Sequence, residues 1–267
     1  MEFNARQVKN DCVEWIRQWF AENGDGCNAI IGISGGKDSS VVAALCVEAL
    51  GKDRVLGVLM PNGVQSDIDD SYALVNHLGI KFIVDDIKAT FDSVISCLKD
   101  APIVRPDVNG AFETLEISNQ TVVNLPARLR MVNLFAIAQS YNGRVANTSN
   151  LSERYIGYST FLGDGVGHFS PLANLVTDEV IGVGMECDLP KRLVRKIPAD
   201  GLSGKKDEDN FGFTYQQLNQ CIRTGHCDDP AVEELINRKH IQNLFKLLPM
   251  PSFNPKNSVM GDNAGCN

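Results

Sequence analysis

The fold of this chain is decided by the stretch Ile31-Gly32-Ile33-Ser34-Gly35-Gly36-Lys37-Asp38-Ser39-Ser40. Residues 28–33 form an apolar run typical of a buried strand, and residues 41–50 carry apolar side chains at helical spacing. Between them, two glycines let the backbone approach a ligand because no Cβ is in the way. The unpaired N–H groups and the positive dipole end of the following helix favour an anion there. The stretch therefore predicts a strand, a phosphate-binding loop and a helix.

Two common nucleotide-binding motifs do not fit the same residues. A Walker A loop requires a glycine five positions before its Gly-Lys pair and Ser or Thr directly after it. This chain has Ile31 and Asp38 at those positions. The dinucleotide pattern Gly-x-Gly-x-x-Gly also fails, because Ser34 stands where its second glycine is required. The remaining structural alternative is an ordinary Gly-rich turn with a capping serine.

The composition limits the classes of function. The chain has 267 residues, of which 43% are hydrophobic and 22% are charged, as in soluble globular proteins. Its net charge of -8 argues against a general nucleic-acid surface, which needs clustered Lys and Arg. No apolar run approaches the length of about 18 residues that spans a bilayer. We therefore expect a cytoplasmic protein that binds neither nucleic acid nor membrane.

Eight cysteines are scattered along the chain without a Cys-x-x-Cys pair. The N-terminus opens an amphipathic helix and not a secretory signal, so reduced thiols in a cytoplasmic protein are expected. Cys221, His226 and Cys227 could suggest a metal, but their spacing matches no standard zinc pattern.

Apolar periodicity along the chain favours an α/β fold with alternating strands and helices. Strands are predicted at 54–60, 81–84 and 144–148, and helices at 5–22, 66–78 and 119–141, where Pro126 predicts a kink or a later start. Residues 99–118 are expected to form a less regular connection. This order implies right-handed crossovers and a doubly wound, mainly parallel sheet with helices on both faces. Ligands then gather beyond the carboxyl ends of the strands, and one domain over residues 1–267 is expected.

The loop pattern Ser-Gly-Gly-x-Asp-Ser resembles that of the ATP-pyrophosphatase (adenine nucleotide α-hydrolase) superfamily. Further blocks occur in the order seen in the NAD synthetase family. They are Met60-Pro61 with Gln65 and Asp67, residues 127–131, residues 147–153, residues 157–165, residues 198–202, Asp207-Glu208 and residues 213–215. The resemblance covers roughly residues 5 to 250.

This resemblance implies a ligase. Members adenylate the nicotinate carboxylate of deamido-NAD with ATP, and ammonia then displaces AMP to give the amide of NAD. The chain is similar to the ammonia-dependent form, because no further segment offers a glutaminase domain with a Cys-His site. The family also implies a homodimer, with the long helix at 119–141 between subunits. Two alternatives stay open: another ATP-pyrophosphatase that adenylates a different acid, and a nucleotide-binding regulator without catalysis.

The resemblance also implies roles for individual residues. Arg128 and Lys246 match residues that bind deamido-NAD, and Asp38 and Glu153 match ligands of Mg²⁺, for which hard oxygen donors are suited. The residues expected at ATP are Gly32, Ile33, Ser34, Gly35, Gly36, Lys37, Asp38, Ser39 and Thr148. Plain structural alternatives exist: Asp38 as a helix cap, Glu153 as a surface residue, and Arg128 with Arg130 as a solvent-facing pair.

Four positions depart from the family pattern, namely Phe161, His168, Thr177 and Ala199. Phe161 and Thr177 stand where lysines are expected, and His168 stands where a substrate-binding aspartate is expected. We hypothesise that Lys37 compensates for the charge lost at Thr177 by reaching a phosphate as a mobile point charge. The polar, glycine-bearing segment at 201–211 is expected to act as a lid.

Overall fold

A parallel sheet of four strands forms the centre of the computed structural model, which describes residues 3–104, 112–196 and 207–253. The strands are β1 (Asn28–Gly32), β2 (Val55–Leu59), β3 (Lys81–Val84) and β6 (Gly143–Val145), in the order β3-β2-β1-β6. Ile31 pairs with Gly57 of β2, and Ile30 pairs with Val145 of β6. The predicted doubly wound parallel sheet is therefore confirmed.

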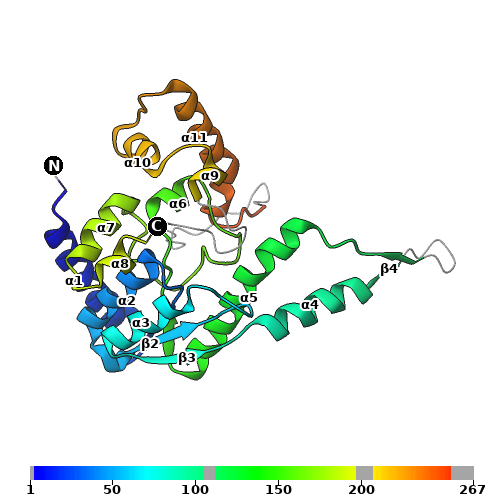
Figure 1. Cartoon of the computed structure of the whole chain (residues 1–267), viewed down its shortest axis with the longest axis horizontal. Helices are drawn as coiled ribbons and strands as arrows, with labels where there is room; N and C mark the ends of the chain where they lie inside the picture. The colour runs from blue at the N-terminus through cyan, green and yellow to red at the C-terminus, as the bar shows by residue number, and fades with distance from the viewer. Residues whose placement is uncertain (1–2, 105–111, 197–206, 254–267) are drawn as a thin grey trace.

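Helices cover both faces of the sheet because alternate strand residues face opposite sides. On one face, Ala29 and Ile31 pack in a core with helices α1 (Ala5–Asn23), α2 (Lys37–Leu50), α3 (Ile68–Leu78), α7 (Thr177–Met185) and α8 (Lys191–Val194). On the other face, Ile30 and Val58 pack with Leu134 of helix α5 (Asn119–Ser140), and helix α4 (Lys88–Asp100) lies beside α5 (Figure 1). A short 3-10 helix, η1 (Lys52–Arg54), precedes β2.

The strand order changes direction between β1 and β6, which are neighbours in the sheet. From β1 the chain passes through α2 to β2 and through α3 to β3, and it returns through α5 to β6 on the other side of β1. Loops that leave two such strands diverge and open a crevice at the carboxyl ends. The phosphate-binding loop follows β1, so it lies at this crevice.

A smaller group of helices lies beyond the carboxyl ends of the strands (Figure 1). It consists of α6 (Leu151–Tyr155), α9 (Asp207–Phe211), α10 (Tyr215–Thr224), α11 (Pro230–Asn243) and the 3-10 helix η2 (Leu244–Lys246). Its own apolar core includes Ile156, Phe211, Leu218 and Ile236. Apart from α6, its helices come from the end of the described chain, and they lie over the crevice.

The expectation that the cysteines are reduced is wrong for one pair in this group, because Cys221 and Cys227 form a disulfide. Gly225 ends α10 in the left-handed conformation, and the turn brings the two Cα atoms to 4.9 Å. Among the described residues, Cys12, Cys27, Cys46, Cys97 and Cys187 are free thiols.

An arm formed by α4, β4 (Pro102–Val104), β5 (Phe112–Thr114) and the start of α5 extends from the body of the protein (Figure 1). β4 and β5 pair antiparallel, so part of the connection predicted to be irregular is a hairpin. Residues 105–111 lie outside the described residues.

Pro126 lies inside α5, which begins at Asn119, so the later start predicted from this proline is wrong. Within the described ranges, no helix has the length and apolar character that crossing a membrane requires.

Candidate functional site

The loop between β1 and α2 approaches its neighbours more closely than a side chain at Gly35 would allow. Gly35 has a φ of +74°, and a Cβ there would lie 2.9 Å from the Cβ of Asp70 and 2.9 Å from the backbone nitrogen of Ser71. Both residues belong to the start of α3, and Ser71 Oγ donates to the carbonyl of Ile33. Glycine is therefore required at this position by conformation and by space.

Hydroxyl groups hold the same loop in shape. Ser34 Oγ lies 3.1 Å from Ser39 Oγ and accepts a 3.2 Å hydrogen bond from the backbone N–H of Gly36. Ser40 Oγ donates to the carbonyl of Gly36 at 2.7 Å. Gly36 is the N-cap of α2, so the first N–H groups of the helix have no acceptor within the helix. These features are those expected of an anion site, and Ser34 is exposed at the surface of the loop.

Asp38 and Glu153, the two residues expected to bind a metal, meet through Asn150. Asn150 Nδ2 donates to Asp38 Oδ1 at 3.0 Å, and the backbone N–H of Asn150 donates to Glu153 Oε2 at 3.3 Å. Asn150 also caps α6 by accepting from the backbone N–H of Glu153. Asp38 is not the cap of α2, which is Gly36, so the helix-cap alternative for Asp38 is wrong.

Glu153 is influenced by its charged surroundings. Burial, followed by the neighbouring Asp38 carboxylate, raises the pKa of Glu153 to about 8, and the ammonium of Lys37 acts in the opposite direction. A carboxyl group whose charge is suppressed by another carboxylate nearby is suited to receive a cation. The surface-residue alternative for Glu153 does not describe this position.

The side chain of Lys37 lies inside the cluster of carboxylates. It is 3% exposed, and its Nζ lies 2.8 Å from Asp38 Oδ2. Burial acts to lower the pKa of Lys37, but the carboxylates of Asp38, Glu153 and Asp207 outweigh burial and raise it. The ammonium is therefore not the mobile point charge that the sequence suggested. The backbone N–H of Lys37 stays at the start of α2, where phosphate binding was predicted.

Sequence reasoning did not identify Asp207 and Tyr215 as parts of this site. Asp207 is 5% exposed and accepts a 2.9 Å hydrogen bond from the Tyr215 hydroxyl. The Tyr215 ring centroid lies 5.6 Å from Lys37 Nζ. Both residues occur in blocks that resemble the NAD synthetase family, but no spacing in the sequence connects them to residue 37. Only the tertiary fold, which brings Tyr215 at the start of α10 to Lys37 at the start of α2, does so.

Arg128 and Lys246 both contact the segment at 157–165. Arg128 Nε donates to the carbonyl of Phe161 at 3.3 Å, and Lys246 Nζ donates to the carbonyl of Ser159 at 3.0 Å. The two cations come from α5 and η2, and the structure brings them to the same loop. Their binding of one substrate stays a prediction. Thr148 follows β6, next to the strand that leads into the phosphate loop.

The departures from the family pattern have clear local environments. His168 Nδ1 accepts a 2.9 Å hydrogen bond from the backbone N–H of Val145, and the Phe161 ring packs against Phe245 with centroids 5.6 Å apart. Thr177 is buried, and its hydroxyl is one of three buried side-chain atoms without a partner in the described part of the chain. Ala199 lies outside the described residues, as do residues 201–206 of the expected lid, while residues 207–211 form α9.

The donor set fits Mg²⁺ held jointly with a triphosphate. Within residues 3–104, 112–196 and 207–253, no group of three or more His, Cys, Asp or Glu side chains is close enough to hold a metal alone. Two carboxylates with water and phosphate oxygens suit Mg²⁺, which keeps several waters and binds through one or two carboxylates. Asp38 and Glu153 therefore fit the expected metal as a partial site that a bound nucleotide completes.

The parallel sheet, the Ser-Gly-Gly-x-Asp-Ser loop after β1 and the paired carboxylates at the strand ends define an ATP-pyrophosphatase-like nucleotide-binding protein. Residues 8–254 match the NAD synthase family. The NH(3)-dependent NAD(+) synthetase of Pyrococcus horikoshii is 36% identical over 211 residues, which cover 79% of this chain and 76% of the relative. The chain belongs to the NAD synthase family.

Solved structures agree with this assignment. NMN synthetase from Francisella tularensis has a TM-score of 0.83 and 29% identity, and the match covers 95% of this chain and 100% of that one. NAD+ synthetase from Burkholderia pseudomallei has a TM-score of 0.72 and 26% identity, with 93% and 92% coverage. The predicted fold, the predicted family and its ligase activity are confirmed by these likenesses.

Proposed function

We propose that the chain activates the nicotinate carboxylate of deamido-NAD with ATP and converts it to the amide with ammonia. The supporting observation is the Gly35 loop beside Asp38 and Glu153 at the carboxyl ends of β1 and β6. A carboxylate oxygen attacks the α-phosphorus of ATP, and pyrophosphate leaves. Ammonia then attacks the activated carbonyl carbon, the bond from carbon to the bridging oxygen breaks, and AMP departs.

The roles of the residues follow from their positions. The N–H groups at the start of α2 and the hydroxyls of Ser34 and Ser39 hold the phosphates, which fixes the α-phosphorus in line for attack. Asp38 and Glu153 hold Mg²⁺, which when bound neutralises charge on the departing pyrophosphate. Arg128 and Lys246 bind the acid substrate through its phosphates, for which cationic donors are suited. One domain over residues 1–267, in the cytoplasm, carries these groups in this proposal.

A second candidate differs only in the acid. The structure of an NMN synthetase has the higher TM-score of the two solved structures described above. The same chemistry applied to nicotinate mononucleotide gives NMN, and that acid lacks the adenylate half of deamido-NAD. Phe161 and Phe245 close together at the loop that Arg128 and Lys246 contact, which places an apolar surface there. This observation favours a smaller or differently placed acid.

Comparing the two acids in one assay tests the proposal. Turnover is measured as AMP and pyrophosphate released with saturating Mg²⁺, ATP and ammonia, with either deamido-NAD or nicotinate mononucleotide. A larger kcat/KM with deamido-NAD supports the first candidate, and a larger kcat/KM with nicotinate mononucleotide supports the second. No release of pyrophosphate with either acid contradicts both and leaves the catalytically silent regulator.

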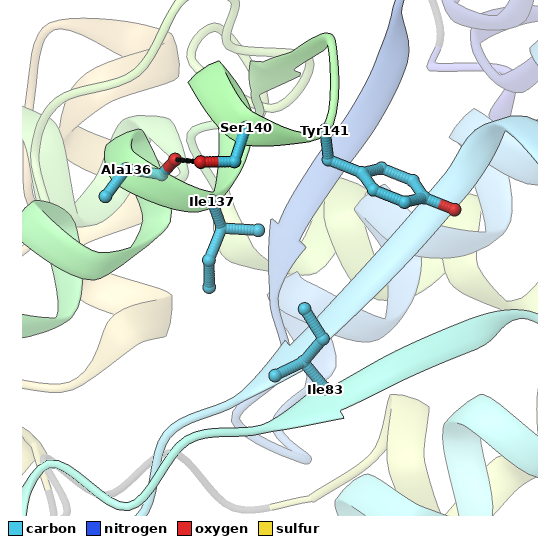
Figure 2. A pocket seen from close by; sticks show the side chains of 5 residues that line it. All are labelled: Ile83, Ala136, Ile137, Ser140 and Tyr141. Carbon is cyan, nitrogen blue, oxygen red and sulfur yellow. Dashed lines mark hydrogen bonds between the residues drawn. The ribbon is translucent and has the colours of Figure 1, made fainter.

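We further propose a homodimer, in which the surface beside α5 lies between the subunits. Val122 and Val132 of α5 and the side chains of β3, an edge strand, are exposed. A pocket of about 270 Å³ lies between β3 and the end of α5. It is lined by Ile83, Ala136, Ile137, Ser140 and Tyr141 (Figure 2). Exposed apolar surface of this extent is typical of an interaction site. A monomer in sedimentation that keeps full activity contradicts this proposal.

A further inference from the structure

The position of the Lys37 ammonium relative to the two expected metal ligands carries a further inference, which rests on the metal site of the proposed function. We propose that Lys37 is a tethered cation that competes with Mg²⁺ for Asp38, and that Asp207 holds its ammonium when the metal binds. Lys37 then sets how strongly nucleotide binding depends on the metal.

Asp38 has a donor on each carboxylate oxygen. Oδ1 accepts from Asn150 Nδ2 at 3.0 Å, and Oδ2 accepts from Lys37 Nζ at 2.8 Å. A metal ion that binds either oxygen must replace or crowd a donor there. Repulsion between an ammonium and Mg²⁺ is far stronger than repulsion between an amide and Mg²⁺, since the ammonium carries a full charge. Metal binding at Asp38 therefore requires the Lys37 ammonium to move.

The ammonium has limited freedom to move. Its side chain is 3% exposed, and its backbone is fixed in the first turn of α2. The Tyr215 ring, 5.6 Å from Nζ, closes one side, and the Tyr215 hydroxyl donates to Asp207 at 2.9 Å. Asp207 is itself 5% exposed. The alternative partner for the ammonium is therefore the buried Asp207 carboxylate, which a small movement of the flexible lysine side chain brings within reach.

The charge balance of the cluster supports competition. Asp38, Glu153 and Asp207 are the carboxylates that act on Lys37, and Lys37 supplies a positive charge among them. A partly buried carboxylate such as Asp38 is stabilised by a neighbouring cation, and the Lys37 ammonium supplies one. Without the lysine, Mg²⁺ becomes the cation that stabilises Asp38. When Lys37 is present, Mg²⁺ must bind beside an ammonium that already neutralises Asp38, so the metal stabilises the cluster less.

The test measures binding of the nonhydrolysable analogue α,β-methylene-ATP by calorimetry, once with EDTA and once with saturating Mg²⁺. The ratio of the two dissociation constants reports the gain that the metal provides. In Lys37→Met this ratio should rise at least about tenfold, because the competing charge is gone. Lys37→Arg keeps the charge, so its ratio should stay close to that of the unmodified protein. Lys9→Met is the matched control, since Lys9 is also ion-paired and is 15% exposed, but it lies on α1 beside Glu48.

Asp207→Asn provides an independent measurement if Lys37→Met does not fold. Removing this carboxylate deprives the displaced ammonium of a partner, so the metal-dependent ratio should fall severalfold. In a folded Lys37→Met background, the same substitution should change the ratio less than it does in the unmodified protein. Metal-induced shifts of the thermal midpoint, measured with α,β-methylene-ATP present, should be larger in Lys37→Met than in Lys9→Met.

The inference is overturned if the ratio of the dissociation constants with EDTA and with Mg²⁺ in Lys37→Met lies within twofold of the ratio in Lys9→Met. A difference of about twofold is the precision with which two variants can be compared. These measurements need no acid substrate and no turnover. A rise in the ratio together with no product from either nicotinate nucleotide therefore refutes the proposed function and leaves the competition intact. Loss of all metal dependence in Lys37→Met also contradicts the inference.

Discussion

Lys246 Nζ donates a 2.7 Å hydrogen bond to the backbone carbonyl of Gly157, which fixes η2 against the loop that follows α6. Gly157 has a φ of +65°, and a Cβ there would lie 2.1 Å from the Cβ of Asn243. The close contact between this glycine and the end of α11 brings Lys246 to the segment at 157–165, which Arg128 also contacts. The lysine thus has a structural role in addition to its expected role at the acid.

Replacing Lys246 should weaken the binding of the acid substrate more than it slows the reaction of the bound acid. Lys246 is partly buried, and the resulting desolvation lowers the pKa of its ammonium. Lys246→Met should raise KM for the nicotinate nucleotide about tenfold or more, with a smaller change in kcat. Steady-state kinetics with ATP held saturating measures this. Lys239→Met, earlier on the neighbouring helix α11, is the control, and equal effects of both substitutions would argue against a substrate contact.

Gly35 should be far less tolerant of alanine than another glycine with the same backbone conformation. Gly26 has a φ of +68°, and a Cβ added there would have no atom within 4 Å, whereas a Cβ at Gly35 would meet Asp70 and Ser71 at 2.9 Å. Gly26→Ala should cost about 1 kcal/mol of the free energy of unfolding, through backbone strain alone. Gly35→Ala should cost at least about 2 kcal/mol more in unfolding or abolish nucleotide binding. Denaturant titration and calorimetry measure both, and similar values for the two variants would contradict the close approach.

Asp38 should be needed for turnover. Asp38→Asn keeps the size of the side chain but removes the charge that holds the metal, so kcat/KM should fall about 100-fold or more. Asp69→Asn is the control, because Asp69 is an exposed carboxylate in the first turn of the adjacent helix α3. Activity is titrated with Mg²⁺ for each variant. A loss in Asp69→Asn as large as that in Asp38→Asn would mean that general negative charge, and not the metal site, is responsible.

His168 should make the fold sensitive to acid. Partial burial, with a contribution from the Arg144 cation, lowers the pKa of His168 below its ordinary value of 6.5, and protonation removes the acceptor of the Val145 N–H. Its contribution to stability is therefore complete above pH 6.5 and is lost as the pH falls from 6.5 toward the lower pKa of the folded state.

The thermal midpoint, followed from pH about 7.5 to about 5.5, checks this. His168→Asn should lose part of the decrease seen in the unmodified protein, because the amide does not titrate. His77→Asn is the matched substitution at a surface position that contacts the carbonyl of Asp188. Identical pH profiles for the unmodified protein and His168→Asn would refute the assignment.

The proposed subunit interface should be sensitive to charge. Val132 on α5 is 63% exposed, and Val132→Glu should dissociate the dimer because a carboxylate would be buried without a partner. Ile241→Glu is the control, since Ile241 is 71% exposed on α11, away from α5. Sedimentation velocity measures both. Unchanged sedimentation of Val132→Glu would place the interface elsewhere.

The elements around the phosphate loop were predictable because local patterns determine them. The apolar run before Gly32 reflects burial, and the paired glycines reflect backbone conformation over a few residues. The strand at 81–84 was predicted from its short apolar run, although its residues are exposed in the structure. The start of α5 at Asn119 was also predicted from its apolar periodicity, and in the structure Ser118 caps this end by accepting a hydrogen bond from the backbone N–H of Thr121. The hairpin of β4 and β5 was missed, since strands of three residues are too short to carry a clear alternation.

The direction of the Lys37 side chain was not predictable from the loop. Its neighbours Asp207 and Tyr215 follow about 170 residues later, and only the tertiary fold brings them to Lys37. A lysine after two glycines equally suits a phosphate or a carboxylate. The Cys221–Cys227 disulfide was missed for a related reason, because the left-handed turn at Gly225 and not the spacing alone brings the two residues together.

Transfer of labelled oxygen tests the central claim most directly. The nicotinate carboxylate is labelled with ¹⁸O and incubated with ATP, ammonia, Mg²⁺ and the enzyme. The account predicts that one ¹⁸O atom per amide appears in AMP, because the carboxylate attacks the α-phosphorus and its oxygen leaves with AMP. Labelled orthophosphate together with ADP would show attack at the terminal phosphorus and would contradict the account.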